Sequence, residues 1–164
     1  MMTQGADLFG YPEGLTLIEP MDKGELVYEF ILAGNAKFSI KSNKTGKHFT
    51  FKVRKDKDTG IWYVSRLTSD NEYLYLGAIF KDDMLFRTTR RTGMKEARSE
   101  AFRAFDWFWL ILNRDKTVPT GVTFYHVGRC GMCGLELTDP TSIKEGYGPD
   151  CSKKRLRRSF GDNT

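Results

Sequence analysis

Polar and apolar side chains alternate over residues 47–54, which read KHFTFKVR. Along an extended chain, Phe49, Phe51 and Val53 face one side, and the polar residues between them face the other. Short polar turns that contain Gly bound the stretch at both ends. The sequence therefore predicts a β-strand with one face in a core and the other toward solvent.

Further strand-like stretches lie on both sides of this one. Residues 37–41 alternate in the same way, and residues 61–67, 73–80 and 84–89 are rich in aromatic and β-branched residues. Strands this close together, joined by short polar turns, form an antiparallel meander. Residues 25–32 fit either a short helix or a first strand, and both interpretations stay open.

The hydrophobic period lengthens at residue 95, from two residues to between three and four. Residues 95–114 predict one long amphipathic helix, whose apolar stripe would cover the apolar face of the sheet. The stripe consists of Ala97, Ala101, Ala104, Phe105, Phe108, Ile111 and Leu112. Trp107 lies off this stripe, and we expect its indole to be partly exposed. The predicted fold class is α+β.

Residue types that bind metals gather near the C-terminus. His126, Cys130, Cys133 and Cys151 are separated by 3, 2 and 17 residues. Tetrahedral zinc takes four N or S ligands, usually as two close pairs that the fold brings together. Pro149 suits the first position of a helix, so Cys151 would lie in its first turn. The pattern predicts a treble-clef-like finger with one structural Zn²⁺. A redox motif shares the Cys spacing, but the βαβ context of such motifs is missing.

The same residues argue against catalysis. With four protein ligands, the zinc would have no position for a reactive water. The chain has 2 His, and it shows no nucleophile motif, carboxylate pair or Gly-rich phosphate loop. We therefore expect that the protein is not an enzyme.

The apolar segments are short. The longest purely apolar run, residues 107–112, is far too short to span a membrane. The N-terminus has no basic segment followed by an apolar one, and 3 Cys make a poor disulfide framework. We expect a cytoplasmic protein without membrane contact.

The formal net charge is +5, with a sequence pI near 9.1. Three basic groups stand out. The first is Lys153, Lys154, Arg155, Arg157 and Arg158; the second is Arg87, Arg90, Arg91, Lys95 and Arg98; the third is Lys37, Lys41, Lys52, Arg54 and Arg66. Each group also fits a merely solvated surface or a local ion pair.

Two interpretations of these basic groups stay open. The first is nucleic-acid binding, to DNA or RNA, with Lys and Arg on phosphates. The strand residues Trp62, Tyr63, Tyr73 and Tyr75 would stack on bases if they faced the basic side of the sheet. The alternative is a protein-binding modulator or inhibitor of a host complex, whose basic surface engages an acidic partner.

The C-terminal stretch also resembles a known family. The match rests on residues 125–134, 137–143 and 146–151, which read YHVGRCGMCG, LTDPTSI and GYGPDC. This pattern is similar to that of an uncharacterised zinc-finger family of bacterial and bacteriophage proteins. The resemblance implies a metal site, and a host cytoplasm if the protein is phage-encoded, but no established activity. Met132 and Leu135 stand where the family usually has Arg.

Composition then divides the chain into parts. We expect a flexible arm at residues 1–20, a sheet and helix domain at 21–114, a linker at 115–121 and a zinc-finger module with a basic C-terminal helix or tail at 122–160.

Overall fold

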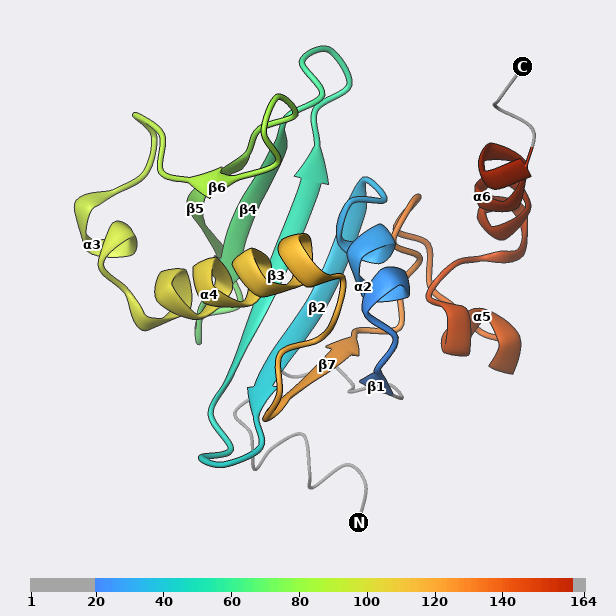
Figure 1. Cartoon of the computed structure of the whole chain (residues 1–164), viewed down its shortest axis with the longest axis horizontal. Coiled ribbons are helices and arrows are strands. Elements are labelled where there is room, and N and C mark those ends of the chain that lie inside the picture. The colour runs from blue at the N-terminus through green and yellow to red at the C-terminus, as the bar shows by residue number, and fades with distance from the viewer. Residues whose placement is uncertain (1–19, 161–164) are drawn as a thin grey trace.

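A seven-stranded antiparallel sheet forms the frame of the computed structural model, which describes residues 20–160 (Figure 1). The expected arm at residues 1–20 therefore lies almost entirely outside the described residues. The strand order is β1-β7-β2-β3-β4-β5-β6. The strands are β1 (Pro20–Met21), β2 (Asn35–Ser42), β3 (His48–Lys55), β4 (Trp62–Leu67), β5 (Tyr73–Ile79), β6 (Phe86–Arg87) and β7 (Val122–His126).

The predicted meander is present as β2 to β6. Each of these strands pairs with the next one in the sequence, and Phe38 of β2 lies opposite Phe51 of β3. The alternation in β3 is confirmed in part, because Phe51 and Val53 are fully buried while Arg54 is exposed. Thr50, on the face expected to meet solvent, is also buried, and its hydroxyl lies 2.6 Å from that of Ser39. The stretch that fitted either a helix or a strand is helix α2 (Gly24–Ile31).

Strand β7 occupies a place that its position in the sequence does not suggest. We expected it to open a separate module after a linker, but it lies inside the sheet, between β1 and β2. Phe124 of β7 is opposite Ile40, and His126 is opposite Phe38. The cysteine-bearing segment therefore begins within the frame of the main sheet.

The single helix predicted over residues 95–114 is wrong. The chain forms α3 (Met94–Ala97) and, after a break, α4 (Glu100–Asp115). The break is at Ser99, whose extended backbone begins α4 and whose side-chain oxygen accepts a hydrogen bond from the N–H of Phe102 at 3.1 Å. Such an N-cap satisfies a donor that a continuous helix would not leave free.

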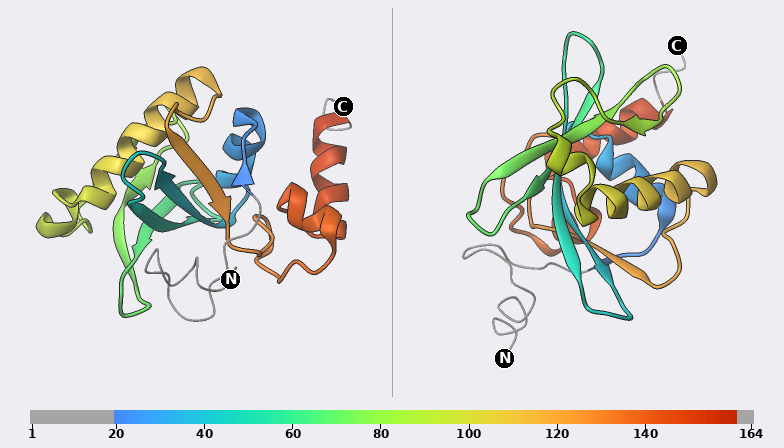
Figure 2. Two further views of the ribbon diagram at one scale, coloured as in Figure 1. Left: turned by 90° about the horizontal axis from the view of Figure 1, so that it is seen from below. Right: turned by 90° about the vertical axis from the view of Figure 1, so that its left-hand side faces the viewer.

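The core lies between the sheet and two helices on the same face, α2 and α4 (Figure 2). Four residues of the predicted stripe are buried, namely Ala101, Phe105, Phe108 and Leu112. Trp109 is also buried, and its indole N–H donates to the carbonyl of Met84 at 2.8 Å. Trp107 is 46% exposed, as predicted. None of the helices within residues 20–160 has the length and apolar character needed to cross a membrane.

Candidate metal centre and basic sheet face

Three cysteines meet at one point beside the sheet. The sulfurs of Cys130, Cys133 and Cys151 all lie within 4.8 Å of one another. Four thiolates on a tetrahedral zinc would be about 3.8 Å apart, given a Zn–S distance near 2.3 Å. The three thiols are therefore close to the spacing at which they can hold one metal ion. Within residues 20–160, no fourth His, Cys, Asp or Glu joins this cluster.

A tight turn positions the first two cysteines. The N–H of Cys130 donates to the carbonyl of Leu135 at 2.8 Å, and the N–H of Gly134 donates back to the Cys130 carbonyl at 2.9 Å. The sulfur of Cys130 accepts from the backbone N–H groups of Met132 and Cys133, at 3.4 and 3.5 Å. Donors aimed at a sulfur favour its thiolate form, which is the form that binds metals.

The third cysteine comes from a helix start. Helix α5 (Pro140–Glu145) leads through Gly146 into α6 (Pro149–Phe160), and Cys151 lies in the first turn of α6. Pro149 occupies the first position of that helix, as predicted from the sequence. Cys130 and Cys151 are buried and Cys133 is exposed, so one side of the cluster faces solvent.

Burial and hydrogen bonding give the buried thiols different acidities. Burial alone would raise the pKa of Cys130, but backbone N–H groups of Cys133, Gly148 and Met132 lower it below its usual value. Burial, reinforced by contacts with the other two cysteines, raises the pKa of Cys151 to about 12. A metal that binds here must therefore displace a proton from Cys151.

His126 does not join the thiols, which corrects the expectation that it is the fourth ligand. Its Nδ1 accepts the N–H of Gly128 at 3.0 Å, and its Nε2 lies 2.5 Å from the carbonyl oxygen of Ile143. A neutral imidazole with its proton on Nε2 satisfies both contacts and leaves no lone pair for a metal. The cause is the strand register, which turns the fully buried ring toward Phe30, 5.8 Å away between ring centroids.

The cysteine turn is fixed to the sheet. Asn35, the first residue of β2, donates its backbone N–H to Gly131 and its side-chain amide to Met132, both at 2.8 Å. Gly131 in turn donates to the carbonyl of Gly146 at 2.9 Å. The turn, the start of β2 and the end of α5 thus form one hydrogen-bonded unit.

The structure ties part of the C-terminal basic group to the protein itself. Arg155 pairs with Glu29 of α2 at 3.0 Å, and its guanidinium lies 5.1 Å from the ring centre of Tyr147. Lys153 and Lys154 are exposed. The side chains of Arg157 and Arg158 lie outside the part that the structure describes. This group is therefore not a wholly free basic tail.

Some members of the other two basic groups meet on the sheet face that the helices leave uncovered. Lys52 lies 4.7 Å and Lys37 lies 5.8 Å from the ring centre of Tyr73. Arg91 lies 5.2 Å from the ring centre of Tyr75 and 6.0 Å from that of Tyr63. We call this surface the basic sheet face; it consists of Tyr63, Tyr73, Tyr75, Lys37, Lys52, Arg54 and Arg91.

Several predicted members of the basic groups lie elsewhere. Arg66 pairs with Glu96 of α3 at 2.7 Å, because its strand position matches that of the buried Phe51. Arg87 pairs with Asp83 at 2.8 Å, while Arg90 is exposed with no ion pair among the described residues. Trp62 is buried, and its indole N–H donates to the carbonyl of Leu32, so it cannot stack on a base.

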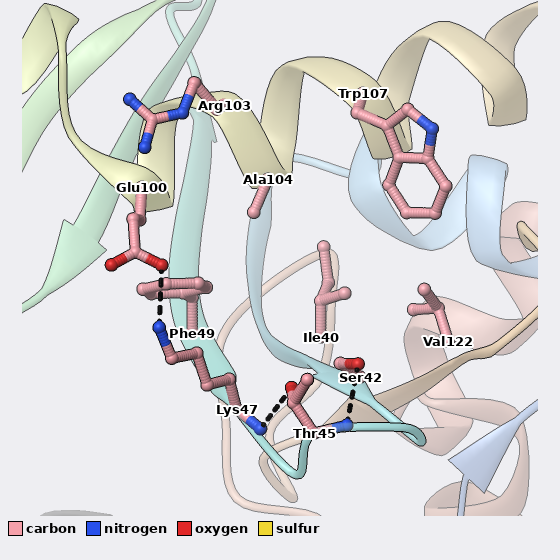
Figure 3. Close-up of a pocket in the computed structure, with 10 residues that line it drawn as sticks. All are labelled: Ile40, Ser42, Thr45, Lys47, Phe49, Glu100, Arg103, Ala104, Trp107 and Val122. Atoms are coloured by element: carbon pink, nitrogen blue, oxygen red, sulfur yellow. Dashed lines mark hydrogen bonds and ion pairs between the residues drawn. The ribbon is translucent and has the colours of Figure 1, made fainter.

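A shallow groove of about 360 Å³ runs between α4 and the neighbouring strands (Figure 3). Its apolar lining comes from Ile40, Phe49, Ala104, Trp107 and Val122. At its rim Lys47 pairs with Glu100 at 3.0 Å. The sequence signal for this groove is the off-stripe Trp107. The groove contains no thiol, imidazole or carboxylate pair, so its lining offers contact area rather than reactive groups.

Comparison with known proteins adds one finding. Residues 121–156 match the model of a family of unknown function, DUF6011. The match spans β7, the cysteine turn, α5 and the first two thirds of α6, and it supports a likeness of this segment to an uncharacterised family. No curated protein and no solved structure matches the chain.

Proposed function

We propose that this protein is a small zinc-binding protein that binds nucleic acid through its basic surfaces. The observation that supports this most is the basic sheet face, where Lys37, Lys52 and Arg91 lie beside tyrosine rings. Among the described residues, none of these three cations has a carboxylate within ion-pair distance. Uncompensated Lys and Arg beside aromatic rings are typical of surfaces that contact phosphates and bases.

The metal in this proposal is one structural Zn²⁺, held by Cys130, Cys133 and Cys151 in a treble-clef-like arrangement. Soft thiolate ligands select zinc over hard cations. The turn that supplies two of them has no core of its own, so bound metal would stabilise it. Since His126 is committed to the backbone, the fourth position falls to a water or to a ligand from outside residues 20–160.

The proposal is a binding role and not catalysis. The thiols surround a metal position, and the buried imidazole of His126 makes two backbone hydrogen bonds. Within residues 20–160, the three-cysteine cluster includes no imidazole or carboxylate that could take a proton from a metal-bound water.

A salt titration tests nucleic-acid binding. Labelled 20-nucleotide single strands and duplexes would be titrated with the protein, by fluorescence anisotropy, between 50 and 300 mM salt. We expect binding whose log affinity falls linearly with log salt concentration, because each phosphate contact releases counterions. Absence of binding at 50 mM salt would refute the proposal.

A second candidate function is binding of an acidic protein partner at the same face. The feature that favours it is the closeness of the positive charges of Lys37, Lys52 and Arg129, which adds to the larger effect of burial in lowering the pKa of Lys37. Such a concentration of positive charge attracts any polyanion. Poly-glutamate provides the test: it carries negative charge without bases. If poly-glutamate displaces labelled DNA at equal charge concentration, the surface recognises negative charge and not bases. An acidic protein then becomes the better candidate for the partner of this surface.

A further inference from the structure

The basic sheet face is not a uniform positive surface, because its aromatic rings have a definite arrangement. Tyr63 of β4 and Tyr75 of β5 are neighbours across the strand pair, with ring centroids 6.1 Å apart and planes inclined by 53°. The rings are therefore not stacked on each other. The residues next to them in sequence, Val64 and Leu76, are fully buried under the helices, so both tyrosines lie on the opposite face.

An irregularity in the sheet brings the two rings to the same face. The pairing of β4 with β5 shifts between Val64 and Ser65, so that Ser65 lies opposite Tyr75 while Val64 lies opposite Gly77. Bulges of this kind re-aim side chains and are frequent at functional sites. Without the shift, the strict two-residue period would turn the side chain of Tyr75 to the face of the sheet opposite that of Tyr63.

Cations lie beside each of the three rings. Arg91, which follows β6, lies within 6.0 Å of the ring centres of both Tyr63 and Tyr75. Lys52 is 4.7 Å from that of Tyr73. By contrast, Arg66, Arg87 and Arg155 all form ion pairs with carboxylates. Lys37, Lys52 and Arg91 are instead held beside aromatic rings, and these weaker contacts leave their charge available to a phosphate.

The ring spacing favours an unpaired strand over a duplex. Successive stacked bases in a duplex strand are about 3.4 Å apart, whereas the rings of Tyr63 and Tyr75 are 6.1 Å apart. A sheet surface cannot reach the faces of bases inside a duplex, but it can take bases that are already unstacked.

We infer that Tyr63, Tyr73 and Tyr75 stack the bases of single-stranded nucleic acid, while Arg91 and Lys52 contact its phosphates. This inference rests on the proposed nucleic-acid binding and adds its site and its ligand class. Each base–tyrosine stack forms on a separate ring, and the flexible cations move from the ring to the incoming phosphate.

The experiment compares three labelled 20-nucleotide ligands at one salt concentration: a single strand, the matching duplex and an abasic single strand. For the wild type, we expect the single strand to bind at least tenfold more tightly than either of the other two. Tyr75→Leu keeps apolar bulk but removes the ring, and it should weaken single-strand binding about tenfold. It should leave binding to the abasic strand unchanged.

Two further variants separate charge from stacking. Arg91→Ala should weaken binding to the normal and abasic strands alike and reduce the salt slope by about one phosphate contact. Trp107→Leu removes an exposed aromatic ring from α4, away from this face, and serves as the matched control with unchanged binding. Thermal melting of each variant establishes that it is folded.

The outcomes distinguish the two proposals. Salt-dependent binding that is equal for the single strand and the duplex, and indifferent to Tyr75→Leu, overturns the stacking site while the proposed function stands. Weakening by Trp107→Leu without weakening by Tyr75→Leu also overturns it. Absence of binding to all three ligands by the wild type overturns the proposed function itself.

Discussion

The ring of Phe30 fills the space that a side chain on Gly131 would need. A Cβ added to Gly131 would lie 2.7 Å from two carbons of that ring, and one added to Gly146 would lie 2.9 Å from it. Phe30 belongs to α2 and is fully buried. The two glycines belong to the cysteine turn and to the end of α5. The Phe30 side chain of α2 therefore packs against both of these segments.

Gly131→Ala tests the packing of the cysteine turn against Phe30. The new methyl group would overlap a buried ring that cannot move aside, and overpacking of this kind costs about 1–3 kcal/mol. We expect the free energy of unfolding, from urea titration of the zinc-loaded protein, to fall by that amount. Gly148→Ala is the matched control, because no atom lies within 4 Å of its added Cβ. Equal effects of the two substitutions would show that the packing against Phe30 does not matter.

His126→Ala separates a metal ligand from a structural histidine. Because both ring nitrogens bind the backbone, we expect zinc stoichiometry to stay at one per chain. Stability should fall by about 1–3 kcal/mol, since the substitution orphans the buried Gly128 N–H and Ile143 carbonyl. Metal analysis and urea unfolding measure the two quantities. Cys133→Ser is the comparison and should abolish zinc binding; loss of zinc in both variants would restore His126 as the fourth ligand.

The acid limb of the stability curve depends in part on Asp139. Its side chain accepts a hydrogen bond from the N–H of Ser142 and caps α5. Hydrogen bonds from Ser142, first from its side chain and then from its backbone, lower the pKa of Asp139 below its usual value. The stabilisation is therefore present above the carboxylate's unfolded pKa and is lost as pH falls through the lower folded pKa.

Asp139→Asn keeps the capping oxygen and removes the charge. We expect this variant to lose less stability than the wild type between pH 5 and pH 2, in urea titrations of the metal-free protein. Parallel curves for the two proteins over this range would contradict the assignment.

The break between α3 and α4 gives a further prediction. Ser99→Ala removes the acceptor for the N–H of Phe102 and should lower the free energy of unfolding by about 1 kcal/mol. Ser99→Asp retains an acceptor and should restore most of the loss. If the helix ran on through residue 99, alanine would instead stabilise the protein, because it has the higher helix propensity.

Local sequence signals predicted the meander and the meeting of the cysteines. The alternation over β3 needs no distant partner, and the Cys spacing fits a turn followed by a helix start. The helix break was missed because the apolar stripe continues from Ala97 to Ala101 across Ser99. The signal that marks the break is Ser99 itself, a preferred N-cap residue, followed by the acidic Glu100 in the first turn of the helix.

Features that depend on pairing between distant strands could not be predicted. The two-residue strand β1 has no periodicity to detect. The position of β7 between β1 and β2 depends on residues 80 or more positions away, as in the Phe38–His126 register. That register, and not the spacing to Cys130, decides which way the His126 ring points. The outward direction of Tyr75 likewise depends on the bulge beside Val64.

The location of β7 has a practical meaning for anyone who wishes to transplant the cysteine segment. The matched stretch, residues 121–156, includes a strand with neighbours on both edges. Cut out alone, the segment would leave both edges of β7 unpaired and would lose the Phe30 ring that packs against Gly131 and Gly146. A graft that preserves the site must therefore include α2 and β2, or it must be placed in a protein whose own sheet has unpaired strand edges that β7 can join.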